Sequence, residues 1–142
     1  MSLHLIKLCA GAGGVDDLRA RVERSVERNR KTRGEAVHIH ETRMFPRRRE
    51  ELLNGGSIYW VIKGVVLVRQ KIVDIEAFSD VDGVNRCAII LDPTLIATEA
   101  QPRRAFQGWR YLAADDAPRD LRRGEKSAPP ALRAKLAELG LL

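Results

Sequence analysis

The stretch that decides the fold runs from residue 57 to residue 78 and reads SIYWVIKGVVLVRQKIVDIEAF. Residues 57–63 are rich in β-branched and aromatic side chains, which favour a strand, and Gly64 interrupts the run. The next run, residues 65–78, begins with four consecutive apolar residues, a pattern typical of a strand that is buried on both faces. The middle of the chain is therefore predicted to be rich in buried β-structure.

The chain on both sides of this stretch divides into further elements. After it, two turns separate three strand-like runs, at residues 86–91, 95–100 and 108–112. Before it, residues 3–9 and 36–44 have strand patterns, and apolar and polar side chains alternate in the second of these. The predicted order is strand, helix, strand, helix and then a run of strands.

Two helices are predicted before residue 57. The first covers about residues 16–31, and its apolar stripe at helical spacing consists of Val15, Leu18, Val22 and Val26. Its first turn is acidic and its last turn is basic, as the helix dipole favours, and Gly34 provides a stop. The second helix is short, because Pro46 suits its first position and residues 54–56 end it.

The C-terminal part changes in character. Residues 113–129 are rich in Ala, Asp, Arg and Pro and predict an irregular surface segment. Residues 130–140 predict a C-terminal helix, with Leu132, Leu136 and Leu139 at helical spacing.

A single domain is expected over residues 1–142, because this length is common for one domain. The fold class that we predict is α+β. Its centre is a small mixed β-barrel with an N-terminal helix, a short helix before the barrel and a C-terminal helix.

The charge balance predicts an anionic partner. The chain has 25 Lys and Arg against 19 Asp and Glu, a formal net charge of +6. Such a bias favours nucleic acid, nucleotides or an anionic membrane, and Arg suits phosphate better than Lys does. No window approaches the roughly 18 apolar residues of a membrane span, and the N-terminus lacks the apolar run of a signal peptide. We therefore expect a cytoplasmic protein without a membrane partner, in which Cys9 and Cys87 are buried thiols.

Two basic clusters are candidate binding sites. In Arg47-Arg48-Arg49, at the start of the short helix, guanidinium groups and unpaired backbone N–H groups would converge on an anion. The alternative is solvated charge that Glu50 and Glu51 offset.

The second cluster, between residues 103 and 111, interleaves arginines with aromatic residues, as suits the phosphates and bases of single-stranded nucleic acid. Phe106 and Trp109 are expected to be exposed there, whereas Trp60 and Tyr111 are expected in the core.

Other polar residues are expected to be structural. His38 and His40 share a strand face, but a zinc site needs a third ligand that nothing nearby provides, so no metal is expected. Asp74, Glu76 and Glu99 would do acid–base work only with a shifted pKa, and surface ion pairs are the alternative. No cofactor is expected, and no catalytic residue is identified.

Several blocks of the chain resemble a bacterial family of unknown function. They are residues 3–9, Thr42-Arg43-Met44 with Pro46, residues 55–64 and residues 102–112, and the resemblance covers roughly residues 3–121. This family has no assigned activity, so the resemblance implies none.

A more distant likeness is to the PUA-like superfamily, which includes PUA, ASCH and EVE domains. The helix that ends in Leu52-Leu53-Asn54-Gly55 is similar to the helix-then-glycine opening of ASCH domains. The ASCH pattern G-x-K-x-x-E-x-R is nevertheless absent after Gly55, since its three charged positions hold Ser57, Trp60 and Ile62. The likeness implies a small β-barrel beside a cleft that binds RNA or a modified base.

Three functions follow from these observations. The first is an uncharacterised domain that binds nucleic acid, RNA rather than DNA, in an Arg-rich, aromatic-lined cleft. The second is an enzyme that acts on a nucleotide or modified nucleoside, and the third is a protein-interaction module. The oligomeric state stays open. The residues expected to bind nucleic acid are Arg47, Arg48, Arg49, Lys63, Arg103, Arg104, Phe106, Gln107, Trp109 and Arg110.

Overall fold

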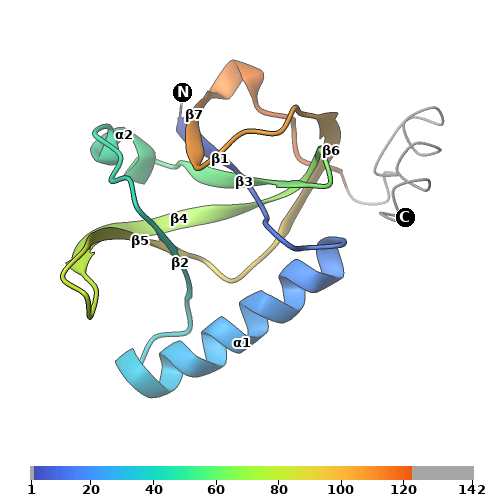
Figure 1. The fold of residues 1–142 in the computed structure, drawn as a ribbon. Coiled ribbons are helices and arrows are strands. Elements are labelled where there is room, and N and C mark those ends of the chain that lie inside the picture. Colours follow the sequence, from blue (N-terminus) through green and yellow to red (C-terminus); the bar gives the residue numbers. More distant parts are fainter. Residues whose placement is uncertain (1, 123–142) are drawn as a thin grey trace.

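The structure, a computed structural model, describes residues 2–122 and consists of an open sheet with two α-helices packed against it (Figure 1). The strands are β1 (Leu3–Leu8), β2 (His38–Thr42), β3 (Ser57–Ile62), β4 (Val65–Ser79), β5 (Asn85–Leu91), β6 (Ile96–Pro102) and β7 (Trp109–Ala113). The helices are α1 (Val15–Arg33), α2 (Arg49–Leu53) and a short 3-10 helix, η1 (Ala114–Asp116). The predicted strands are confirmed, with ends that differ by at most two residues.

The long strand β4 organises the sheet because it pairs with three other strands. Its first half lies between β3 and β6, and its second half pairs with β5. The strand order is β2-β5-β4-β3-β1-β7, with β6 beside β4, and the pairing of β1 with β3 is parallel. Lys63 and Gly64 join β3 to β4 in a tight turn, and both have positive φ angles, 48° and 81°, as a type I′ hairpin turn requires.

The predicted β-barrel is wrong, because the sheet does not close on itself. Its end strands, β2 and β7, each pair with an inner strand but not with each other. Helix α1 covers the outer edge of β2 instead. The side-chain amide of Asn29 donates to the carbonyl oxygen of Val37 at 2.8 Å, and the N–H of Ile39 donates to Ser25 Oγ at 3.2 Å. The helix thereby satisfies backbone groups that a closing strand would need. The C-terminal helix predicted at residues 130–140 lies outside the described residues.

Side chains, rather than a β-ladder, bridge the two ends of the sheet. The indole N–H of Trp109 on β7 donates to the carbonyl oxygen of Met44, in the loop after β2, at 2.8 Å. The backbone N–H of Arg48 donates to the hydroxyl of Tyr111, also on β7, at 3.0 Å. Trp109 is therefore buried, with 9% of its surface exposed, and the expectation that this residue is exposed is wrong.

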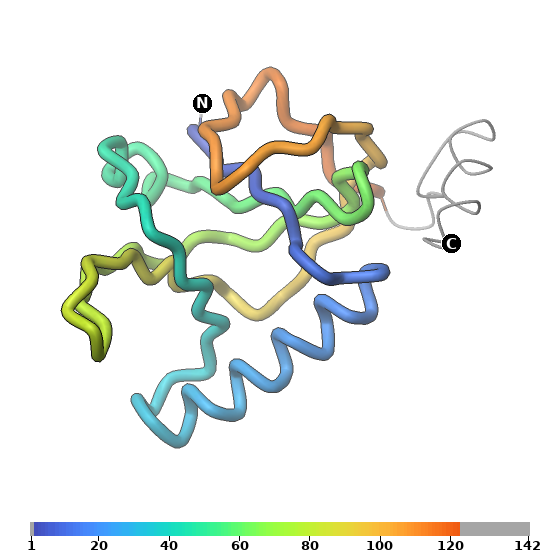
Figure 2. The backbone as a smooth tube through the Cα atoms, in the orientation of Figure 1, coloured from blue at the N-terminus to red at the C-terminus, as the bar shows by residue number. Residues whose placement is uncertain are grey.

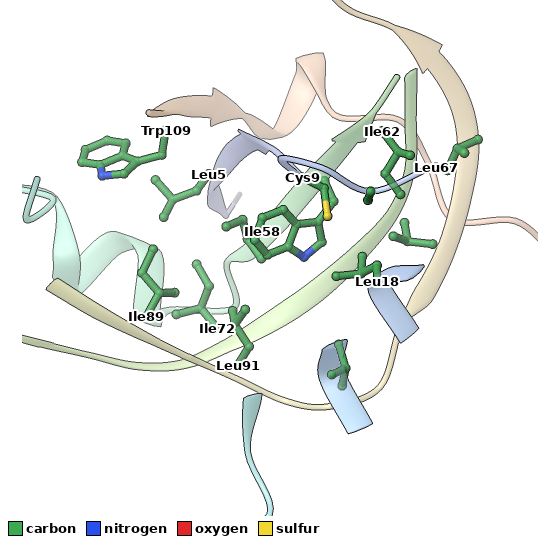
Figure 3. Close-up of a cluster of buried hydrophobic side chains, with 14 of the residues drawn as sticks. Leu5, Cys9, Leu18, Ile58, Ile62, Leu67, Ile72, Ile89, Leu91 and Trp109 are labelled. Atoms are coloured by element: carbon green, nitrogen blue, oxygen red, sulfur yellow. The ribbon is translucent and has the colours of Figure 1, made fainter. Parts of the chain in front are cut away.

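The main core lies between β1 and β3 on one side and β4 and β5 on the other, and α1 covers one end of it (Figure 3). Leu5 and Ile58 point toward Ile89 and Leu91, and Leu18 reaches the same cluster from α1. The backbone trace shows α1 running along the sheet and the β4–β5 hairpin projecting away from it (Figure 2). Cys9 and Cys87 are free and buried, as predicted.

The chain after β7 returns to β6 along its outer edge. The N–H of Leu121 donates to the carbonyl oxygen of Ala97 at 3.0 Å, and the N–H of Glu99 donates to that of Arg119 at 2.9 Å. The described part of the predicted irregular segment thus includes η1 and a stretch attached to the sheet. No helix within residues 2–122 has the length and apolar character that crossing a membrane requires.

Candidate nucleic-acid interface

The structure divides the predicted basic residues into two groups. Helix α2 lies just before the start of β3, whereas Lys63 follows the end of β3. A strand of six residues is about 20 Å long, so that Arg47, Arg48 and Arg49 lie at one end of β3 and Lys63 at the other (Figure 1). The predicted basic residues therefore lie toward opposite ends of β3.

In the α2 group, two of the three arginines are paired within the protein. Arg48 forms an ion pair with Glu51 and its guanidinium lies 5.5 Å from the centre of the Tyr111 ring. Arg49 Nε donates to the carbonyl oxygen of Ile75 at 2.8 Å, and another guanidinium nitrogen lies 2.6 Å from Asp74 Oδ1. Arg49 therefore anchors α2 to β4, whereas Arg47 and Arg48 are both exposed.

The other group forms what we call the turn-end patch: Lys63, Arg103, Arg104, Phe106, Gln107 and Arg110. The N–H of Arg103 donates to the carbonyl oxygen of Gly64 at 2.7 Å, which holds the loop between β6 and β7 against the β3–β4 turn. The guanidinium of Arg103 donates to Gln101 Oε1 and to the carbonyl oxygen of Asp116, at 2.9 and 3.2 Å. Arg103 therefore positions the loop, while Arg104 and Gln107 are exposed on it.

An aromatic ring and a guanidinium lie together in the turn-end patch. Phe106 is partly buried against a second apolar cluster that includes Ile6 and Val61. The guanidinium of Arg110, an exposed residue of β7, lies over this ring, 5.5 Å from its centre. A guanidinium in this position is both a cation and a flat surface on which a base can stack.

The carboxylates that the sequence singled out are all in ion pairs. Asp74 lies 2.6 Å from Arg49, Glu99 lies 2.6 Å from Arg119, and Glu76 lies 3.5 Å from Arg33. These contacts support the interpretation of surface ion pairs over acid–base catalysis. Their partners come from α1, α2 and the segment after β7 rather than from neighbouring strands.

The structure also contains a basic groove that the sequence did not predict. This α1–β2 groove has a volume of about 340 Å³ and is lined by Arg21, Arg24, Ser25, Arg28, His38 and Ile39. Its three arginines follow one another on α1 at i, i+3 and i+7, a spacing that places them on one side of the helix. The sequence contains this spacing, but the spacing indicates a binding site only once β2 is known to lie beside these arginines.

Comparison with known proteins gives a family and no activity. The family model described as "Protein of unknown function (DUF1489)" matches residues 5–142. The chain belongs to the DUF1489 family. No curated protein and no solved structure matches the DUF1489 chain significantly.

A buried amide organises the inner side of the groove in the DUF1489 chain. Gln70 is fully buried, and its Oε1 lies 2.9 Å from the indole nitrogen of Trp60 and 3.1 Å from Nδ1 of His38. Its amide nitrogen donates to the carbonyl oxygen of Asp92 at 3.0 Å. Burial lowers the pKa of His38, and the positive charge of Arg28 lowers it further. The hydrogen bond to Gln70 acts in the opposite direction and raises this pKa, but its effect is smaller than that of burial.

The second strand histidine of the DUF1489 chain, His40, is partly buried. The ring of His40 meets that of Trp60 edge-on, with centres 5.1 Å apart, and its Nε2 is buried without a hydrogen-bond partner. Burial and the nearby positive charges of Lys7 and Arg21 lower the pKa of His40 to about 3. Within residues 2–122, no three His, Cys, Asp or Glu side chains are placed to hold a metal ion.

Proposed function

We propose that the DUF1489 chain binds single-stranded RNA through the turn-end patch. The observation that carries this proposal is the Arg110 guanidinium over the ring of Phe106, on a loop that also presents the exposed Arg104. Proteins that bind single strands combine a stacking surface with cations that follow the phosphates, and this patch supplies both. The net charge of +6 favours the same partner.

Each residue of the patch has a part in this proposal. An unpaired base stacks on the outer face of the Arg110 guanidinium, which Phe106 supports from beneath. Arg104 and Lys63 contact phosphates on either side of this base, and the exposed amide of Gln107 forms hydrogen bonds with its edge. Arg103 holds the loop in place through its bonds to Gln101 and Asp116.

The second basic group extends this path. Arg48 is bonded to Tyr111 in the middle of β7, and β7 is the last strand of the sheet. Tyr111 and Arg110 alternate to opposite faces of β7, so that RNA leaving the patch would pass around this end strand to reach the exposed Arg47 and Arg48. RNA is proposed over DNA because proteins that read RNA by sequence mostly target unpaired bases stacked on aromatic or guanidinium planes.

The test is fluorescence anisotropy with a labelled single-stranded RNA of about ten nucleotides over a series of salt concentrations. Each phosphate contact on a single strand contributes about −0.7 to the slope of log K against log salt. Arg104→Gln with Arg110→Gln should therefore weaken binding, and the slope should become shallower by about 0.7 because Arg104 is the phosphate contact of the pair. The matched control is Arg19→Gln with Arg30→Gln, which removes the same charge from exposed positions on α1. Equal losses in both double variants, or no binding of the native protein at low salt, would contradict the proposal.

A further inference from the structure

The two sides of α1 differ in charge. The α1–β2 groove is lined by three arginines and no acidic residue. The groove on the other side of the helix is lined by two arginines and two acids, with apolar residues between them: Arg19, Glu23, Glu27 and Arg30, with Val22, Val26, Pro93 and Leu95. Glu27 also lies 3.5 Å from Lys31, so that its charge is offset. The excess of positive charge is therefore larger on the β2 side, where the lining of the groove contains no acidic residue.

The hydrogen bonds of Gln70 determine which ring nitrogen of His38 carries the proton. The amide nitrogen of Gln70 must donate to the carbonyl of Asp92, since a carbonyl only accepts, and this orientation turns Oε1 toward Trp60 and His38. Because Oε1 only accepts, Nδ1 of His38 carries the proton in this bond. Nε2 is then the unprotonated ring nitrogen of His38, whose largely buried side chain forms part of the lining of the groove. When Nε2 takes up a proton, it becomes a charged donor at the groove.

We propose that the α1–β2 groove binds the phosphate group of a phosphomonoester, held by Arg21, Arg24 and Arg28, with Nε2 of His38 as a further donor. Guanidinium groups match the oxygens of phosphate geometrically, and their bonds to an anion are stronger than neutral ones. The arginines span about 10 Å along α1, so that the groove has room for the group attached to the phosphate. The site also accounts for the exposed Arg24 and Arg28 on this side of α1, where the guanidinium of Arg21 also lies 3.8 Å from the sulfur of Cys9.

Other groups surround His38 and contribute to its response to pH. They are Arg21, Arg24 and Arg28 from α1, Trp60 from β3, Gln70 from β4 and His40 from β2. Among them the arginines stay charged, and His40 stays neutral at the pH of the experiment. A dianion in the groove would therefore be compensated first by the arginines and then by the proton on His38.

This site shares no residue with the turn-end patch, so that it does not depend on RNA binding there. The chemistry that it recognises, a phosphate with two negative charges, occurs in inorganic phosphate, in a free nucleotide and at the 5′ end of RNA. The experiment is a set of calorimetric titrations that measure the affinity of the protein for four ligands. These ligands are inorganic phosphate, adenosine monophosphate, and a trinucleotide with and without a 5′-phosphate. Preference for the monophosphate identifies a nucleotide site, and preference for the phosphorylated trinucleotide identifies an RNA end.

The variants separate the groove from general charge. Arg24→Gln with Arg28→Gln should weaken phosphate binding about tenfold or more, because two charge-assisted contacts are lost. Arg19→Gln with Arg30→Gln removes the same charge from the opposite side of α1 and should leave the affinity within about twofold. NMR titration of the histidine rings should show that saturating phosphate raises the pKa of His38 and leaves that of His4 unchanged. No phosphate binding, equal weakening in both double variants, or an unmoved His38 would overturn the proposal.

Discussion

The burial of the His40 ring against Trp60 should make the free energy of unfolding depend on pH. His40 lies against Trp60 with its Nε2 buried and unpartnered, and its pKa falls from 6.5 to about 3 in the folded protein. The unfolded chain therefore takes up a proton near pH 6.5, whereas the folded protein takes it up only near pH 3. Between these values the unfolded state binds more protons, so that stability falls as the pH falls.

The size of this effect follows from the two pKa values. Lowering the pH from 7 to 5 should remove about 2 kcal/mol of the free energy of unfolding through His40 alone. His4 and His38 also have lowered pKa values and act in the same direction, so that a comparison is needed to isolate His40. The change that isolates it is His40→Leu, which removes the titrating group and keeps an apolar contact with Trp60.

The assay is urea unfolding of both proteins at pH 7, 6 and 5. The native protein should lose about 2 kcal/mol more than His40→Leu over this range. Direct NMR titration of the native His40 ring gives the same information without the variant and should show no protonation above pH 5. The same pH dependence in both proteins, or a His40 ring that titrates near pH 6.5, would refute the reasoning.

Three further predictions concern the packing. Trp109→Phe removes the bond to the carbonyl of Met44 and should lower the free energy of unfolding in urea by about 1 kcal/mol; an unchanged value would contradict the bridge between the sheet ends. Gly56→Ala places a Cβ 2.3 and 2.4 Å from backbone oxygens of α2 and β1 and should cost about 1–3 kcal/mol or more, whereas Gly14→Ala meets nothing within 4 Å and should melt as the native protein does. Cys87 is fully buried and its pKa is raised to about 11, so that iodoacetamide at pH 8 should label it only after unfolding, and rapid labelling of the folded protein would argue against this burial.

The strands could be predicted from the sequence, but their closure could not. Apolar runs, an alternating pattern and turn residues located the strands because these signals are local. Whether β2 pairs with β7 depends instead on Ser25 and Asn29, two polar residues beside the apolar stripe of α1. Their side chains form hydrogen bonds with backbone groups at the outer edge of β2. A polar pair inside a helix has many other uses, so the sequence does not reveal this contact.

The candidate site was only partly predictable for a related reason. The order of Arg104, Phe106 and Arg110 indicated a mixture of cations and aromatic rings, and the structure places Arg110 over Phe106. Trp109 lies in the same run, yet it alternates to the inner face of β7, where its N–H finds Met44. The α1–β2 groove joins residues from a helix and a strand, and only the packing of the two shows that Arg28 faces His38.

The substitution Arg110→Lys separates stacking from charge in the proposed binding of an RNA base to the turn-end patch. The substitution keeps the positive charge and removes the flat guanidinium over Phe106. RNA affinity measured by anisotropy should fall about fivefold or more, since stacking contributes about 1–3 kcal/mol per base, while the salt slope stays the same. An affinity equal to that of the native protein would contradict the claim, because charge alone would then account for binding.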